Sequence, residues 1–133
     1  MQIKQLLRIM TRLRSRHGCP WDREQTHQSI IRCLKSESRE VIRAIENNDY
    51  HNLQEELGDL LLQVVFHSQL AREAGKFTFN DVVRTLNRKL VRRHPHVFGK
   101  SKARTSEEVL KQWADIKARE KKQRKKSCHS ANA

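Results

Sequence analysis

The sequence predicts an all-α fold, a bundle of four to five helices that dimerises. Two observations exclude a turn-rich β protein. The 133 residues include only 4 Gly and 2 Pro, and apolar side chains recur every three or four residues along several long segments. A third observation points to assembly, because only 36% of the residues are hydrophobic. A chain of this length fits one domain with a thin core, so we expect part of its apolar surface to be buried against a second copy.

The first half of the chain contains two predicted helices. A first helix over roughly residues 2–15 carries an apolar stripe at helical spacing, and Gly18-Cys19-Pro20 ends it. Asp22 is a candidate N-cap, with Gln25 three residues later as its capping-box partner. We therefore expect a second helix that begins at Asp22 and continues to about residue 46.

Turn and capping signals delimit the helices that follow. Asn47-Asn48-Asp49 predicts a tight turn, after which a third helix begins at about residue 53. Gly75 is the expected stop of that helix, because glycine is the usual residue just beyond a helix C-terminus. Thr78 and Asp81 form a capping-box pattern that opens a fourth helix.

The C-terminal part of the chain is predicted as one more helix and a tail. The fourth helix must end before Pro95, and Thr105 with Glu108 forms another capping-box pattern. Apolar periodicity then disappears, and closely spaced Lys and Arg side chains repel one another. We expect residues 1–119 to form the helical domain and residues 120–133 to form a basic, disordered tail.

Charge and cysteine content restrict the partners and the compartment. The net charge of +13 favours polyanions such as nucleotides, nucleic acids or anionic surfaces. Cys19, Cys33 and Cys128 are odd in number and form no Cys-x-x-Cys pair, so we interpret them as free thiols in a reducing compartment. The amphipathic N-terminus is not a signal peptide, and no apolar run is long enough to span a bilayer. We expect a cytoplasmic protein without membrane association.

Two pairs of acidic residues lie on otherwise apolar helix faces. Glu37 and Glu40 are three residues apart on the second helix, as are Glu56 and Asp59 on the third. The short turn makes these helices antiparallel neighbours, which can bring both pairs together. Four converging carboxylates repel one another and are costly to desolvate, and a hard divalent cation relieves both problems. Oxygen-only ligation suits Mg²⁺, or Mn²⁺, and not Zn²⁺.

A simpler interpretation of these acids is a solvated acidic face. Arg39 and Arg43 lie close enough along the second helix to pair with Glu37 or Glu40. Such exposed ion pairs are common on helices and need no metal. Both interpretations remain open from the residues alone.

Four blocks of sequence occur in a characteristic order, and they are Gly18-Cys19-Pro20-Trp21-Asp22, Glu37-Ser38-Arg39-Glu40-Val41, Glu55-Glu56-Leu57-Gly58-Asp59-Leu60-Leu61 and Arg92-Arg93-His94-Pro95-His96-Val97-Phe98-Gly99. Together they resemble the MazG family of nucleoside triphosphate pyrophosphohydrolases. The resemblance covers roughly residues 3–120 and one MazG unit. It implies a MazG-like helical bundle that hydrolyses nucleoside triphosphates between the α- and β-phosphates, releasing a monophosphate and pyrophosphate.

The resemblance also implies roles for the acids. The family signature, E-E-x-x-E followed by E-x-x-D on two adjacent helices, assigns Glu37, Glu40, Glu56 and Asp59 as Mg²⁺ ligands. Glu37 or Glu40 would also accept a proton as a catalytic base. Ser36 departs from the pattern, because it stands where the family usually has the first glutamate. A serine hydroxyl is no base at neutral pH, so the departure affects catalytic efficiency more than metal binding.

Substrate contacts are expected from cations and one aromatic residue. Lys89, Arg92 and Arg93 form one patch at the end of the fourth helix, suited to phosphate groups. The alternative is that they only complement the negative end of that helix. Trp21 either stacks on a base or anchors its loop on the core.

Three functions are compatible with these patterns. The first is Mg²⁺-dependent hydrolysis of nucleoside triphosphates as housekeeping of nucleotide pools. The second is a catalytically weakened MazG-like protein that binds nucleotides or a partner, suggested by Ser36, Arg39 and Arg43. The third is nucleic-acid binding, of which the basic tail supports only weak, non-specific contact because the chain has few aromatic residues.

Assembly is predicted from the third helix. Its middle section is apolar nearly all round, which a thin single-layer bundle cannot bury. The residues concerned are Leu61, Leu62, Val64, Val65 and Phe66. The family resemblance implies a dimer whose site takes residues from both chains, so we expect a homodimer with this helix at its centre. The alternative is a monomer whose own first and fourth helices cover this face.

Overall fold

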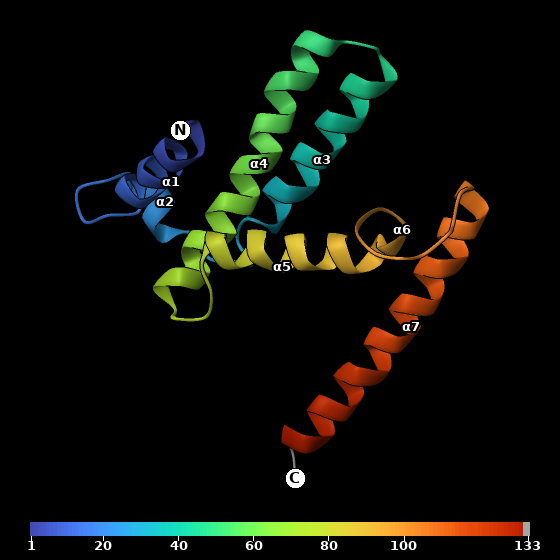
Figure 1. Cartoon of the computed structure of the whole chain (residues 1–133). Coiled ribbons are helices and arrows are strands. Elements are labelled where there is room, and N and C mark those ends of the chain that lie inside the picture. The colour runs from blue at the N-terminus through green and yellow to red at the C-terminus, as the bar shows by residue number, and fades with distance from the viewer. Residues whose placement is uncertain (132–133) are drawn as a thin grey trace. The chain divides into compact units, whose positions relative to one another are not determined.

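The computed structural model confirms an all-helical protein (Figure 1). It describes residues 1–131, with side chains as far as Ser127, and this part of the chain contains no strand. Five of its helices are long, whereas α2 and α6 have 5 and 4 residues. The helices are α1 (Gln2–Leu13), α2 (Pro20–Glu24), α3 (Ile31–Glu46), α4 (Tyr50–Glu73), α5 (Phe79–Arg93), α6 (Pro95–Phe98) and α7 (Ser106–Ala131).

The chain forms two compact units, and the first comprises Met1–Val82. Its core joins α1 to α4 through Met10, Val65, Phe66 and Leu70, with Ile30 added from the turn before α3. Met10 and Val65 are each 1% exposed. Burying a side chain of this size contributes about 1.5–3 kcal/mol, so these few residues supply much of the stability of the unit.

This core corrects one part of the predicted dimer interface. Val65 and Phe66 were expected at the centre of a contact with a second copy, but they pack on Met10 of α1 in the same chain. The amphipathic α1 covers that side of α4 because its apolar stripe needs a partner as well. Leu61, Leu62 and Val64 of the same predicted run stay 37–40% exposed.

An arginine fastens the segment after α1 to the end of α4. The Nη2 and Nε atoms of Arg14 donate to the Glu73 carboxylate at 2.6 and 3.0 Å, and Nη1 donates to the carbonyls of Asp22 and Gln25. The hydrogen bond between Arg14 and Glu73 lowers the pKa of Glu73 and raises the pKa of Arg14. These hydrogen bonds of Arg14 hold the segment before α3 against the end of α4.

The predicted start of the second long helix was wrong. Pro20 opens the short helix α2, which its fixed φ favours at the first helical position, and Asp22 lies inside that helix. Thr26 and Ser29 then exchange backbone-to-hydroxyl hydrogen bonds of 2.8 and 3.1 Å. These bonds satisfy amide groups outside a helix, so α3 begins only at Ile31.

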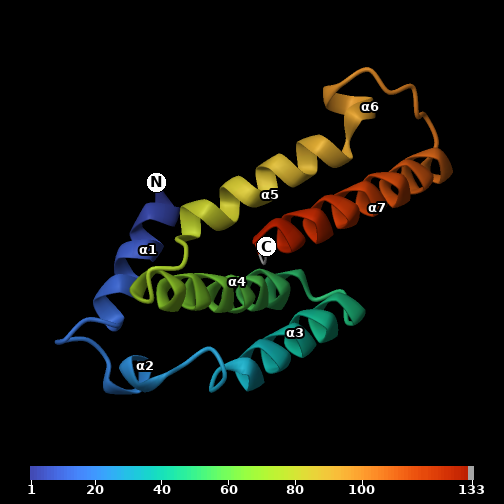
Figure 2. The same ribbon diagram turned by 90° about the horizontal axis from the view of Figure 1, so that it is seen from below.

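The turn between α3 and α4 has the predicted position. Asn48 adopts φ +52°, in the left-handed region that asparagine tolerates. Asp49 caps α4, because its carboxylate accepts a hydrogen bond of 3.2 Å from the amide of Asn52. α4 therefore begins at Tyr50, three residues before the predicted start. Helices α3 and α4 lie side by side and antiparallel in both ribbon views (Figures 1 and 2).

Local signals also delimit α4 and α5 as predicted. Gly75 follows α4 with φ +69°, which a residue with a side chain would adopt only under strain. The amide of Thr78 donates to Asp81 at 2.9 Å, and the amide of Asp81 donates to the Thr78 hydroxyl at 3.2 Å. This reciprocal capping box starts α5, which ends at Arg93 before Pro95.

The second unit begins at Val83 and contains most of α5 with α6 and α7. Arg92 and Arg93 of α5 pair with Glu120 of α7 at 2.6 and 2.9 Å. The ring of His94 meets the ring of Trp113 edge-on at 5.2 Å. The predicted Thr105 cap is present, since the amide of Glu108 donates to its hydroxyl at 3.2 Å.

The structure continues α7 to Ala131, through much of the predicted tail. The ion pairs of Glu120 place the first residue of that tail in the folded unit. Disorder beyond it stays a prediction, and the side chain of Cys128 lies outside the described residues. Cys19 and Cys33 are free. Within residues 1–131 no helix is both long and apolar enough to cross a bilayer.

Candidate metal centre

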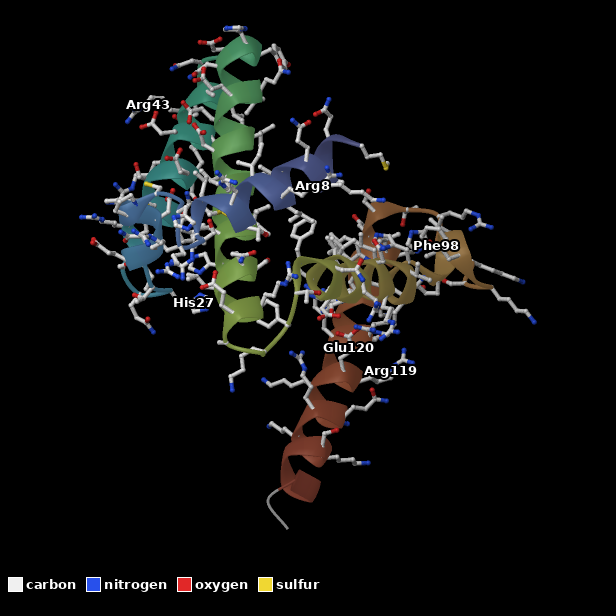
Figure 3. The ribbon with its side chains drawn as sticks, turned by 90° about the vertical axis from the view of Figure 1, so that its left-hand side faces the viewer. Arg8, His27, Arg43, Phe98, Arg119 and Glu120 are labelled. Carbon is white, nitrogen blue, oxygen red and sulfur yellow. The ribbon has the colours of Figure 1, made fainter. Side chains whose placement is uncertain are left out.

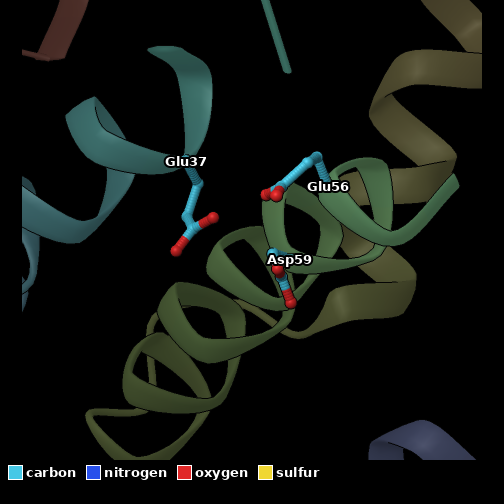
Figure 4. Close-up of side chains that lie close together, drawn as sticks. All are labelled: Glu37, Glu56 and Asp59. Atoms are coloured by element: carbon cyan, nitrogen blue, oxygen red, sulfur yellow. The ribbon is translucent and has the colours of Figure 1, made fainter. Parts of the chain in front are cut away.

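Three of the four predicted metal ligands converge between α3 and α4. Glu37 projects from α3, and Glu56 and Asp59 project from α4 (Figure 4). One carboxylate oxygen from each lies within 4.8 Å of the other two, and all three residues are partly buried. Oxygen atoms this close can contact a single cation.

Helical geometry explains why these residues meet. Glu56 and Asp59 are separated by one helical step of three residues, so both point to the same side of α4. The turn at Asn48 reverses the chain and lays α3 along that side. Glu37 therefore faces the pair from the opposite helix.

The electrostatics of the cluster show unrelieved negative charge. Burial raises the pKa of Glu37, and the neighbouring carboxylates of Asp59 and Glu40 raise it further. The pKa of Glu56 is also raised, first by desolvation and then by Asp59, Glu40, Glu37 and Glu55. Each shift means that the ionised form is disfavoured where it stands. A divalent cation would reverse that balance.

Glu40, the fourth predicted ligand, does not join the other three. Its Oε1 accepts from Nη1 of Arg43 on the same helix at 3.3 Å, and the two side chains are 36% and 67% exposed. At Glu40 the structure therefore shows the exposed ion pair that the acidic-face interpretation expects. An exposed pair of this kind is worth about 0–1 kcal/mol, which a metal ion can readily overcome. Glu40 is close enough to the cluster to raise the pKa of both Glu37 and Glu56.

The donor set fits a hard divalent cation. The three groups are carboxylates, which are the ligands that Mg²⁺ and Mn²⁺ prefer, and the cluster contains no thiol or imidazole donor. Mg²⁺ usually keeps several waters and takes only a few protein carboxylates. A partly buried group of three carboxylates leaves room for such waters and for phosphate oxygens.

The predicted substrate contacts lie in different parts of the chain. Trp21 is in α2 and is 47% exposed, so it is only half-buried. Lys89, Arg92 and Arg93 lie on α5 and line a pocket of the second unit together with residues of α7. Neither placement tests the contact with a nucleotide.

Glu120 is the residue that the sequence interpretation missed. It was assigned to the disordered tail, yet it is the partner of both predicted phosphate-binding arginines. Its only sequence signal is an isolated acid within a run of Lys and Arg residues. The pairing joins residues 27 and 28 positions apart, which no local pattern reveals.

Fold and site together define a class: all-helical proteins in which an antiparallel hairpin presents clustered carboxylates. Residues 25–98 match the family model described as the MazG nucleotide pyrophosphohydrolase domain. The chain belongs to the MazG family.

Similar proteins agree with this assignment. The chain is 55% identical over 124 residues to the nucleoside triphosphate pyrophosphohydrolase/pyrophosphatase MazG of Thermotoga maritima, covering 93% of this chain and 47% of that protein. It is 51% identical over 131 residues to the nucleoside triphosphate pyrophosphohydrolase of Escherichia coli K12, covering 98% and 49%. The crystal structure of a mazG-related protein from Thermotoga maritima superimposes with a TM-score of 0.71 at 30% identity, covering 86% and 98%. The chain thus spans about half the length of the curated relatives it matches.

Proposed function

We propose that this protein hydrolyses nucleoside triphosphates to monophosphates and pyrophosphate in a Mg²⁺-dependent reaction, with Mn²⁺ able to substitute. The carboxylates of Glu37, Glu56 and Asp59 within 4.8 Å of one another carry this proposal. The names of the relatives and the family model support the reaction class. The fit of three carboxylates to a hard cation supports the choice of metal.

The residues of the hairpin have distinct roles in this reaction. Glu37, Glu56 and Asp59 would hold the cation, and Glu40 would be a fourth ligand once its ion pair with Arg43 is broken. A bound Mg²⁺ supplies positive charge that polarises the triphosphate and acidifies water. Glu37 or Glu40 accepts the proton of the attacking water as the catalytic base.

The bond changes follow from these roles. The water oxygen bonds to the α-phosphorus, the bond from that phosphorus to the α–β bridging oxygen breaks, and pyrophosphate leaves with the electron pair. Lys89, Arg92 and Arg93 neutralise the charge on the leaving group. Trp21, which is 47% exposed, stacks on the base.

A second candidate is a weakened MazG-like protein that binds nucleotides or a partner without fast turnover. The ion pair between Arg43 and Glu40 favours it, because that arginine occupies one of the expected ligands. Ser36 favours it too, since it supplies no carboxylate beside Glu37. In this candidate the arginine partly replaces the metal, so calorimetric titration of Mg²⁺ and the rate of turnover both distinguish the two candidates.

The deciding experiment measures pyrophosphate release from a panel of canonical and damaged nucleoside triphosphates. We expect release with Mg²⁺, none with excess chelator, and a loss of at least about a hundredfold in Glu56→Gln, because that variant removes a charged ligand. Glu55→Gln is the matched control, since it changes the adjacent residue, which is outside the cluster. Absence of turnover on every substrate by a protein with a native helical spectrum would contradict the hydrolase proposal.

Assembly and location belong to the same proposal. Exposed apolar residues recur on α4 in the first unit and, separately, on α5 in the second, which we interpret as surfaces buried in a homodimer. They include Leu57, Leu61, Val64, Leu86 and Leu90. The free thiols of Cys19 and Cys33 support a reducing, cytoplasmic location. The basic end of α7 supports weak, salt-sensitive contact with nucleic acid.

A further inference from the structure

The second unit contains a pocket between α5 and α7 in which half of the lining residues are cations. Lys89, Arg92, Arg93 and Arg124 line it with one acid, Glu120. The pocket encloses about 490 Å³, which is within the range of sites for small ligands. Hydroxyl and amide side chains complete the lining, so the whole set suits an anion with several oxygen atoms.

Glu120 already places an anionic group among these cations. Its Oε1 accepts from Nε of Arg92 at 2.6 Å, and its Oε2 accepts from Nη2 of Arg93 at 2.9 Å. The Glu120 side chain is 12% exposed, and that of Arg93 is 19% exposed. Figure 3 shows Glu120 on the α7 ribbon. One carboxylate thus engages two guanidinium groups, that of Arg93 largely buried and that of Arg92 on a side chain that is 50% exposed.

The arginines retain unused capacity for hydrogen bonding. Nε of Arg93 is buried and has no hydrogen-bond partner among the described residues. Each guanidinium carries five N–H donors, of which Glu120 takes one from each arginine. Four cations against one acid also leave the pocket with excess positive charge. A ligand with more anionic oxygens than a carboxylate would satisfy this pocket better.

We propose that Glu120 is an internal competitor for phosphate groups, holding donors of Arg92 and Arg93 until the pyrophosphate part of a nucleotide displaces it. Carboxylate and phosphate oxygens accept the same forked donors of arginine, so one can replace the other. Pyrophosphate also reaches Lys89 and Arg124. The return of Glu120 after hydrolysis favours release of the product and keeps single phosphate ions from occupying the pocket. The inference rests on the proposed function for the identity of its ligand.

Glu120 has two opposing effects on the affinity of the pocket for phosphate, so whether its removal raises or lowers that affinity tests the proposal. Its charge repels an incoming phosphate, but it also holds two like-charged side chains in place. Competition predicts that removing the charge tightens phosphate binding, whereas positioning predicts that it weakens binding. We expect competition to prevail, because Glu120 uses donors that the ligand needs.

Calorimetric titration of inorganic pyrophosphate into the full chain measures that sign. The buffer contains a chelator, so that the carboxylates of α3 and α4 hold no metal. We expect Glu120→Gln to bind pyrophosphate about tenfold more tightly than wild type, the effect of releasing charged hydrogen-bond donors. Glu107→Gln, which makes the same change in the first turn of α7, should leave the affinity within about twofold. Unchanged or weaker binding by Glu120→Gln with a native helical spectrum would overturn the proposal.

A second measurement uses the wild-type protein and does not depend on how the variant folds. Nuclear magnetic resonance follows the Nε–H signal of Arg92 and the carboxyl carbon of Glu120 during the pyrophosphate titration. Both signals should move as the ion pair opens, and binding that leaves both unmoved would also overturn the proposal. If Glu120→Gln tightens binding but no triphosphate is hydrolysed, the proposed function fails and this inference stands. If triphosphates are hydrolysed but Glu120→Gln binds pyrophosphate as wild type does, this inference fails and the proposed function stands.

Discussion

Ser36 stands where the family signature leads us to expect a glutamate, and it lies on α3 directly before Glu37. Its side chain is exposed, so a larger side chain can replace it without disturbing the core. We expect Ser36→Glu to raise kcat by at least about tenfold, because a positioned general base typically contributes more than that. Steady-state pyrophosphate release at saturating Mg²⁺ measures the change.

Ser38→Glu is the control for this substitution. It adds the same charge to α3 two residues further on, where the helix turns it toward a different side. We expect its kcat to stay near that of wild type. An equal kcat for Ser36→Glu and wild type would show that the missing glutamate does not limit turnover.

At the scale of helices, one acid of α7 pairs with two arginines of α5. Hydrogen bonds from Arg93, which has the larger effect, and from Arg92 together lower the pKa of Glu120 to about 2. A pKa lowered by folding contributes stability that is fully present above the ordinary value near 4.5 and is lost as pH falls toward 2. We therefore expect the second unit to lose stability through this acidic window. Amide hydrogen exchange on α7 between pH 5 and about 2.5 measures the loss.

Glu120→Gln tests the origin of that acid sensitivity. The variant has no carboxyl to protonate, so its α7 should be less stable at neutral pH and much less sensitive to acid. The acids of the first unit act in the opposite direction without metal, because the pKa values of Glu37 and Glu56 are raised. Their ionisation destabilises that unit as pH rises through those values. Identical acid profiles for the variant and wild type would rule out Glu120 as the cause.

At the scale of the whole molecule, α4 has two apolar sides with different partners. Val65 is 1% exposed and belongs to the core with α1, whereas Val64 is 40% exposed beside Leu57 and Leu61 on the other side. A helix that stays this apolar on its exposed side needs a further partner. A second copy of the chain is the partner we propose.

Val64→Asp and Val65→Asp separate the interface from the core. Wild type should sediment near twice the chain mass of 15.8 kDa. Val64→Asp should sediment near a single chain mass and keep its helical spectrum, because the new charge lies at the exposed position. Val65→Asp should unfold the first unit, since it buries a charge beside Met10. A folded wild type at a single chain mass would exclude the dimer.

The sequence by itself determined those features that depend on neighbours in the chain. Gly75 and the box of Thr78 and Asp81 end and begin helices through their own backbone and side-chain chemistry, so their positions were predictable. The spacing of Glu56 and Asp59 determined that they share a helix face, because helical periodicity is a local property. Local signals were ambiguous before α3. The capping pattern of Asp22 predicted a helix start there, whereas Thr26 and Ser29 form a turn that delays the helix.

Only the tertiary structure decided which surfaces meet. It placed Val65 under α1 rather than at a subunit boundary, and it joined Glu120 to two arginines on another helix. It also left Glu40 with Arg43 while Glu37 turned toward Glu56 and Asp59. Apolar periodicity shows that a face must be buried but carries no information about its partner, because many faces have the same hydrophobic pattern. Contacts between residues far apart in the chain depend on packing and long-range charge, so they emerge only when the helices are placed together.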